Sequence, residues 1–184
     1  MIGVIFGLFG SALSTLLSVK EMSWYYTGLA ALIALVVNLL VSFLLRGKWN
    51  VRYRNRIKVI SIVLFLGLLV TVYMHTKYFL ECTFAYEDFE QVGYYIKGDV
   101  YTADALKFKA DNPHIVEDGD LVKEGFSLAE KNRVWTPESI RRNTLKLISS
   151  YSFCVIFFVG IISILLEVLM GHYGRSMIKS IETV

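Results

Sequence analysis

Four long apolar stretches restrict this chain to a membrane-embedded fold more than any other feature of its sequence. They run from Ile2 to Val19, from Ser23 to Leu45, from Ile57 to Met74 and from Leu147 to Met170. An α-helix rises about 1.5 Å per residue and the apolar core of a bilayer is roughly 30 Å thick, so each stretch can cross it, the first and third only just. The chain is also 55% hydrophobic and 19% charged, which is too apolar for an ordinary soluble domain. We therefore expect an all-α integral membrane protein with four transmembrane helices.

The loop between the second and third stretches carries concentrated positive charge. Residues 46–58 contain six basic residues and no acidic one. The six are Arg46, Lys48, Arg52, Arg54, Arg56 and Lys58. Short loops rich in Lys and Arg stay in the cytoplasm under the positive-inside rule. We expect a multi-pass membrane protein with this loop and the C-terminus in the cytoplasm.

These six basic residues have three interpretations. Setting the topology is sufficient by itself to explain them. Binding of anionic membrane lipid accompanies it naturally, at about 1 kcal/mol per basic residue near the surface. Docking of a cytosolic effector protein is the third interpretation, and recruitment of nucleic acid to the membrane is a more remote version of it.

The topology divides the chain into three parts. Residues 1–76 would hold three transmembrane helices and the basic cytoplasmic loop 46–58. Residues 77–146 would form an extracytoplasmic loop domain, and residues 147–184 the fourth helix with a cytoplasmic tail. About 70 residues are too many for a simple connection, so the long loop should fold.

The long loop has the pattern of a small mixed α/β domain. The aromatic and β-branched segments 94–96 and 100–101 predict short extended segments or a small hairpin. Thr102 is placed to cap a helix that ends by residues 111–113, Asp-Asn-Pro. A further helical turn is expected around Leu121 and Val122.

The end of the loop contains the best local helix signal. Thr136 is a suitable N-cap, Pro137 fits the first helical turn, and Glu138 favours the positive end of the helix dipole. No Pro or Gly follows until Gly160, which a membrane helix tolerates. One continuous helix is therefore predicted from Pro137 through the bilayer to about Gly171. It can either transmit a signal from the outer domain or merely anchor it.

Small and polar residues within the stretches predict helix packing. The first stretch has small residues at every fourth position, which places them on one helix face: Gly3, Gly7, Ser11 and Thr15. Such faces let helix backbones approach closely in lipid, so a homo-oligomer is expected. Asn38 in the second stretch needs a hydrogen-bond partner on another helix or on a second copy.

No group of residues identifies a reaction. His75, His114 and His172 are scattered without an i, i+4 partner, and each is expected at the solvent or at the membrane interface. Cys82 and Cys154 belong to no CxxC pair. Cys82 is expected as a free thiol, although it could cross-link copies of the protein in an oxidising compartment.

The loop contains one acidic cluster that could be considered a metal site. It comprises Glu117, Asp118, Asp120 and Glu124, and it lacks the spacing of a calcium-binding loop, so a solvated face is expected. The sequence contains no GxSxG, P-loop or dinucleotide motif. We expect no enzyme, no cofactor, no metal and no small-molecule substrate.

The four-span layout, with a long outer loop leading through RVWTPESI (residues 133–140) into the last span, resembles small membrane proteins of bacterial anti-phage defence. The resemblance is greatest to the membrane subunit of the Kiwa system. It implies an inner-membrane oligomer that detects phage attachment or membrane disturbance and signals to a DNA-directed partner. It implies no catalytic residues.

Three functions remain open at this point. The first is a membrane sensor or scaffold whose outer domain detects an envelope event and whose cytoplasmic face holds an effector. The second is a pore-forming or depolarising effector, because a small-residue face and Asn38 could line an oligomer. The third is an assembly factor of a larger membrane complex.

Overall fold

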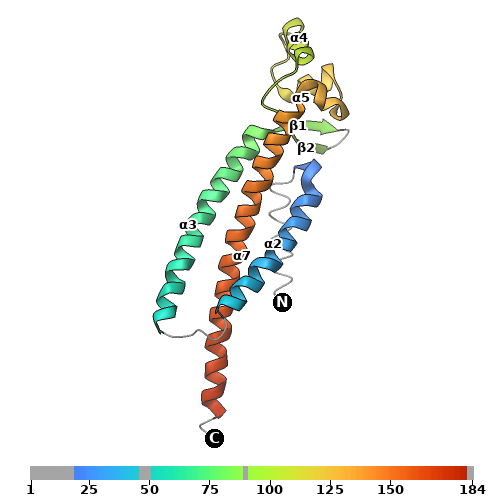
Figure 1. Cartoon of the computed structure of the whole chain (residues 1–184). Helices are drawn as coiled ribbons and strands as arrows, with labels where there is room; N and C mark the ends of the chain where they lie inside the picture. Colours follow the sequence, from blue (N-terminus) through green and yellow to red (C-terminus); the bar gives the residue numbers. More distant parts are fainter. Residues whose placement is uncertain (1–18, 46–50, 89–90, 182–184) are drawn as a thin grey trace. The chain divides into compact units, whose positions relative to one another are not determined.

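Helices make up most of the chain in Figure 1, a computed structural model. The structure describes residues 19–45, 51–88 and 91–181, without the side chains of residues 24–25, 51–54, 88, 91 and 171–181. The chain divides into two compact units. We call the described residues within 1–28 and 74–151 the loop unit, and those within 29–73 and 152–184 the span unit.

Three helices of the described chain are long and apolar enough to cross a membrane. Helix α2 covers Ser23–Leu45, α3 covers Val51–Cys82 and α7 covers Pro137–Ile181. Their candidate spans contain 20, 28 and 34 residues. These helices fit a membrane-embedded protein, as the sequence predicts. The expected span Ile2–Val19 lies outside the described residues except for Val19.

Helix α3 is longer than its apolar stretch at both ends. It begins at Val51, within the expected basic loop, and ends at Cys82 rather than at Met74. The helix therefore covers residues 51–58 of the predicted basic loop and residues 77–82 of the predicted outer loop. No Pro or Gly occurs at either extension, and Arg, Lys and Glu are good helix formers, so the helix continues past the end of its apolar part.

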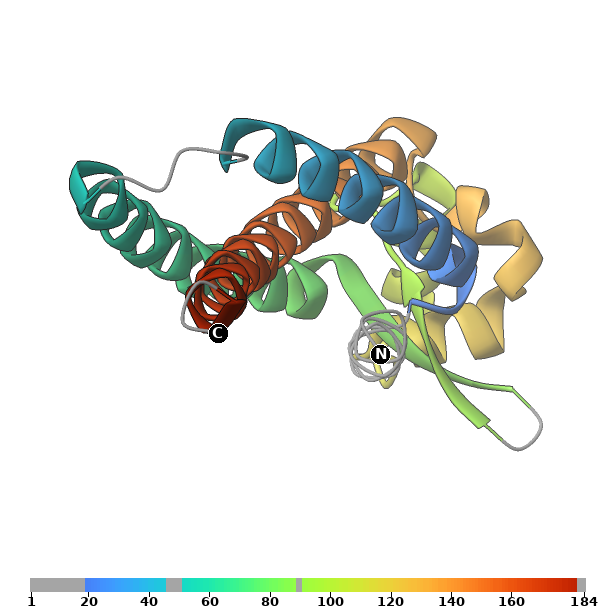
Figure 2. The ribbon, with the colours of Figure 1, turned by 90° about the horizontal axis from the view of Figure 1, so that it is seen from below.

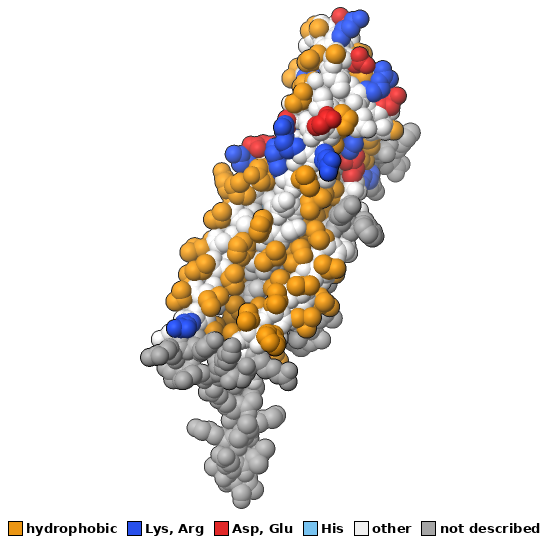
Figure 3. Space-filling view, viewed as in Figure 1, with side chains coloured by type: hydrophobic (Ala, Val, Ile, Leu, Met, Phe, Trp, Pro, Cys, Tyr) orange, Lys and Arg blue, Asp and Glu red, His pale blue; other side chains and the backbone are white. Residues whose placement is uncertain are grey.

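The span unit presents an apolar surface. Its exposed side chains are mostly large hydrophobic ones, including Phe43, which is 81% exposed. In Figure 3 hydrophobic side chains cover the helices, while acidic and basic side chains gather over the loop unit. So much exposed apolar surface would be unfavourable in water and is expected of helices that face lipid.

The helices of the span unit approach closely at small residues. A Cβ atom on Gly67 of α3 would lie 2.9 Å from Cε1 of Phe157 on α7, so glycine leaves the room that this ring occupies. The Ser163 hydroxyl of α7 donates a hydrogen bond to Oδ1 of Asn38 on α2, at 3.0 Å. Asn38 thus has a partner on another helix of the same chain.

The loop unit contains one β-hairpin. Strand β1 (Thr83–Asp88) follows α3 directly and pairs antiparallel with β2 (Gln91–Ile96), with Phe84 opposite Tyr95. The predicted segment 94–96 is therefore a strand. Residues 100–101 do not pair with this strand. Tyr101 makes an isolated bridge with Trp135, which fits the alternative prediction of a short extended segment.

Short helices complete the loop unit. Helix α4 is Ala103–Asp111, α5 is Asp118–Gly125 and α6 is Lys131–Val134. The 3₁₀ turns η1 and η2 are Lys20–Met22 and Leu128–Glu130. The predicted cap of α4 is confirmed, because the Thr102 side chain accepts a hydrogen bond from the Ala105 N–H at 3.3 Å. The predicted helical turn at Leu121 and Val122 is α5.

The core of the loop unit is aromatic. Trp135 is fully buried, with its ring centre 5.2 Å from that of Phe84 and 6.3 Å from that of Tyr101. Phe84 in turn lies against Tyr95 on the facing strand. Helix α5 packs directly on β1, since a Cβ atom on Gly119 would lie 2.5 Å from the Ala85 carbonyl oxygen. These contacts place the core immediately beside the start of α7.

Candidate functional site

The first turns of α7 hold the segment that leaves the β-hairpin. Asn143 lies in the second turn of α7 and is buried. Its side-chain amide donates to the Lys97 carbonyl oxygen at 2.9 Å and to Oδ1 of Asp99 at 2.7 Å. A buried amide bonded in this way costs about 1–3 kcal/mol to disrupt, so it fixes this segment to the helix.

Asp99 adds two ion pairs to the same place. Its Oδ2 atom lies 2.9 Å from a guanidinium nitrogen of Arg142 and 3.3 Å from Nζ of Lys146. Burial alone would raise the pKa of the Asp99 carboxyl. The hydrogen bonds from Asn143, Arg142 and Lys146 outweigh burial and hold that pKa below its usual value of 3.8. We call Lys97, Asp99, Arg142, Asn143 and Lys146 the Asp99 cluster.

Gly98 allows the Asp99 cluster to form. A Cβ atom at this position would overlap the Ser139 hydroxyl and would lie 2.6 Å from Cβ of Trp135. The sequence suggests only a break between strands at Gly98. The structure shows that its role is a close approach of the loop to α7.

A second polar contact ties the same loop segment to α5. Asp118 accepts from Lys97 Nζ at 2.7 Å and from the Tyr101 hydroxyl at 2.5 Å. Burial, together with the hydrogen bond to Asp118, raises the pKa of the Tyr101 hydroxyl. The Asp118 side chain is only 14% exposed.

The expected solvated acidic face is therefore wrong for Asp118. Its three predicted companions, Glu117, Asp120 and Glu124, are exposed, as expected. Among the described residues, no group of three or more His, Cys, Asp or Glu side chains could hold a metal ion.

His75 lies in a buried polar cluster rather than at the solvent. It is 1% exposed, and its Nδ1 atom lies 2.8 Å from the Ser150 hydroxyl oxygen on α7. Its ring packs near Tyr26 of α2 and Tyr151 of α7, and the Tyr151 hydroxyl donates to the Tyr26 carbonyl oxygen at 3.2 Å. These four residues, the His75 cluster, join α2, α3 and α7 within the loop unit.

The other two histidines differ from His75. His114 is exposed as expected, with Nε2 3.3 Å from a carboxylate oxygen of Glu124. The side chain of His172 is not described.

Cys82 and Cys154 are free and buried, so neither thiol is presented at the described surface for cross-linking.

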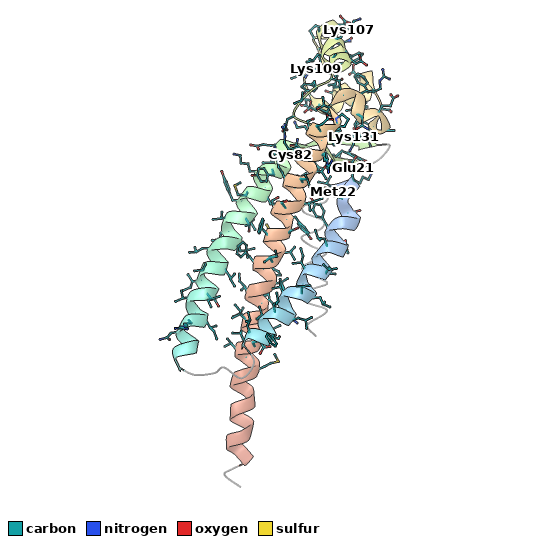
Figure 4. All side chains as sticks on the ribbon, in the orientation of Figure 1. Glu21, Met22, Cys82, Lys107, Lys109 and Lys131 are labelled. Carbon is teal, nitrogen blue, oxygen red and sulfur yellow. The ribbon has the colours of Figure 1, made fainter. Side chains whose placement is uncertain are left out.

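The segment at the start of α2 also contacts the rest of the loop unit. Lys131 Nζ of α6 lies 2.7 and 2.6 Å from the two carboxylate oxygens of Glu21, and Figure 4 shows the two side chains together. Val19 makes a parallel bridge with Tyr94 of β2. Each of the three described helices with a candidate span therefore has one end in the loop unit, and that end contacts the hairpin or the short helices.

The predicted site residues are only partly described. Arg56 and Lys58 lie exposed in the first turns of α3. Arg52 and Arg54 are in the same helix without described side chains. Six further predicted residues lie outside the described part of the chain: Arg46, Lys48, Gly3, Gly7, Ser11 and Thr15. Pro137 is the first residue of α7, and the Thr136 carbonyl oxygen accepts from the Ser139 and Ile140 N–H groups.

The burial of Asn143, one residue of the Asp99 cluster, could have been predicted from the sequence. Ile140, Asn143, Leu147 and Tyr151 follow one another at spacings of three and four, and all are buried. An amide on such an apolar face requires a buried partner. Asp99 has no comparable signal, because its partners are more than 40 positions away.

Comparison with known proteins adds no assignment. No protein family, no curated protein and no solved structure matches the chain.

Proposed function

We propose that this protein is a non-enzymatic membrane sensor or scaffold of anti-phage defence. Its loop domain, on the outer side of the bacterial inner membrane, would detect an envelope event. Its cytoplasmic side would hold or signal to an effector protein. The Asp99 cluster is the observation that supports the proposal most, because it attaches the folded domain to a helix that is long enough to cross the bilayer.

This attachment makes α7 suitable for transmitting a movement of the loop domain along the helix. Its 45 residues run without interruption from Pro137 to Ile181, a length of about 70 Å at 1.5 Å per residue. An anchoring helix needs only a covalent link to its domain. In α7 the second turn is also held by a buried amide and two ion pairs. A displacement of the loop domain would therefore move the helix, and an event that favours one position of the domain would shift the helix with it.

The basic residues 46–58 supply the proposed docking surface on the cytoplasmic side. Arg56 and Lys58 are exposed on α3, as docking requires. The protein is further proposed to work as a homo-oligomer, which the small-residue face of the first stretch favours.

Two sets of variants separate transmission from docking. Replacing Arg52, Arg54 and Arg56 by Gln should release the product of the neighbouring gene during detergent purification. Replacing Asn143 by Leu should leave that protein bound but abolish protection of cells against phage. Leu145→Ala, at an exposed position on the same helix, is the matched control and should change neither.

Three results would count against the proposal. The first is a chain that always purifies without the neighbouring protein. The second is full protection by the Asn143→Leu variant. The third is depolarisation of the cells, reported by a membrane-potential dye upon infection without any effector, which would favour a pore-forming protein instead.

A further inference from the structure

One face of the β-hairpin carries exposed apolar side chains toward its tip. Paired residues of β1 and β2 share a face, and this face carries Thr83 with Ile96, Ala85 with Tyr94, and Glu87 with Val92. Thr83 and Ile96 are buried at the base. Val92 is 64% exposed and Tyr94 is 43% exposed. We call these six residues the lower face of the hairpin.

The opposite face has its partners inside the loop unit. Phe84, Tyr86 and Tyr95 contact one another there, and Phe84 contacts Trp135 of the core. The exposed apolar residues of the lower face are therefore not needed to build the domain core.

The lower face continues from the end of a candidate membrane span. The Tyr94 ring centre lies 5.0 Å from that of Phe79 in the last turn of α3, and the Thr83 hydroxyl donates to the Phe79 carbonyl oxygen at 2.6 Å. The neighbouring Leu80 is 70% exposed. In Figures 1 and 2 the hairpin runs across the axis of the last turns of α3 and extends to the side of them.

We propose that the lower face of the hairpin lies on the lipid headgroups of the membrane that α3 crosses. The apolar surface at the end of α3 is continuous with this face, since it passes through Phe79 to Tyr94 and then to Val92. Tyr residues are enriched at this depth because the ring favours the apolar side and the hydroxyl the wet side. Lys77, exposed in the same turns of α3, lies 3.8 Å from a carboxylate oxygen of Glu81, and both charged groups suit headgroup depth rather than the hydrocarbon core.

Glu87 limits how deep the hairpin lies. It is exposed on the lower face directly opposite Val92, and a carboxylate is costly in the hydrocarbon core. The strands therefore rest at headgroup depth and do not insert. This contact is independent of what the protein senses, because it follows from the membrane placement of α3 alone.

Spin labels at two exposed positions test the proposal in the full-length protein. The protein would be reconstituted in vesicles of phosphatidylethanolamine and phosphatidylglycerol, with the label on Val92→Cys or on Leu106→Cys of α4, which is exposed elsewhere in the loop unit. The native Cys82 and Cys154 are buried and should label poorly. We expect the Val92 label to collide more with oxygen than with a water-soluble nickel chelate, and the Leu106 label to show the reverse.

Two outcomes would overturn the proposal. A Val92 label as accessible to the nickel chelate as the Leu106 label would place the face in water. A Val92 label shielded from both reagents would mean that protein, such as a second copy of the chain, covers it.

A second variant guards against an effect of the label itself. With the label on Glu87→Cys, adding Val92→Asp should shift the label toward the nickel chelate, whereas adding Val92→Leu should not. Equal accessibility in the two variants would also contradict lipid contact.

Discussion

The loop unit and the span unit both contain several helices, but their surfaces and interiors are opposite in character. The loop unit buries aromatic rings around Trp135 and places most of its charges outside or in ion pairs. The span unit exposes large hydrophobic side chains and brings polar groups together internally, as Asn38 and Ser163 do. The difference is the one expected between a unit surrounded by water and a unit surrounded by lipid.

The two units should therefore respond differently to the loss of a side-chain contact. Apolar burial drives the folding of the loop unit, so losing a core side chain should unfold it. The helices of the span unit cannot exchange their backbone hydrogen bonds for water, so they should remain helical when a side-chain contact is lost. Four variants or conditions test this contrast.

Trp135→Ala should have the largest effect. Removing a fully buried Trp side chain costs about 3–5 kcal/mol, enough to unfold a small domain. Limited proteolysis of the detergent-solubilised protein should cut the loop unit, while far-UV circular dichroism should retain the signal of the span helices. Val116→Ala, at a 78% exposed position, should behave like the parent protein. If Trp135→Ala removed most of the helical circular dichroism signal, the two units would not unfold separately.

Asn143→Ala should have the next largest destabilising effect on the loop unit. It leaves the Lys97 carbonyl oxygen and one Asp99 oxygen without their buried donor, a cost of about 1–3 kcal/mol. Hydrogen exchange should rise in the segment after β2 and in the first turns of α7, and not within residues 29–45 of the span unit. Unchanged exchange after β2 would contradict the role given to the Asp99 cluster.

Acid should weaken the loop unit through Asp99. Because the folded-state pKa of Asp99 is lower than its usual value of 3.8, its contribution is complete above about pH 4 and is lost as the pH falls through the folded-state value. The effect should be below about 1 kcal/mol, since the ion pairs are partly exposed and screened. Asp99→Asn should remove this part of the acid dependence of thermal unfolding, and an unaltered pH profile would refute it.

Asn38→Leu should have the smallest effect. Hydrogen bonds between membrane helices contribute about 0.6 kcal/mol on average, because the separated helices find other partners in the membrane. Unfolding from bicelles under steric trapping should detect a change of this size, with Ser163→Ala giving a similar value and the double variant no further loss. A loss comparable to that of Trp135→Ala would mean that the polar pair organises the span unit.

The sequence predicted the parts of the fold that depend on local patterns. The second stretch, the start of α7 at Pro137 and the cap of α4 at Thr102 follow from apolar length, Pro placement and capping chemistry, and the structure has them at those residues. The ends of α3 were missed because helix propensity extends past the apolar residues that signal a span.

The contacts of the candidate site could not be predicted in the same way. His75 looked interfacial because it follows an apolar stretch, and only the approach of Ser150 on α7 makes it buried. Asp99 and Gly98 depend equally on a partner about 40 residues later in the chain. Long-range packing of this kind leaves no periodic pattern in one sequence.

In the proposed topology the loop domain and the basic residues lie on opposite sides of the membrane. It is tested most directly by labelling single cysteines in intact cells with a membrane-impermeant thiol reagent, since both native cysteines are buried. Asp111→Cys, at the exposed end of α4, should react in intact cells, and Arg56→Cys should react only after the inner membrane is permeabilised. Reaction of Arg56→Cys in intact cells together with protection of Asp111→Cys would contradict the account.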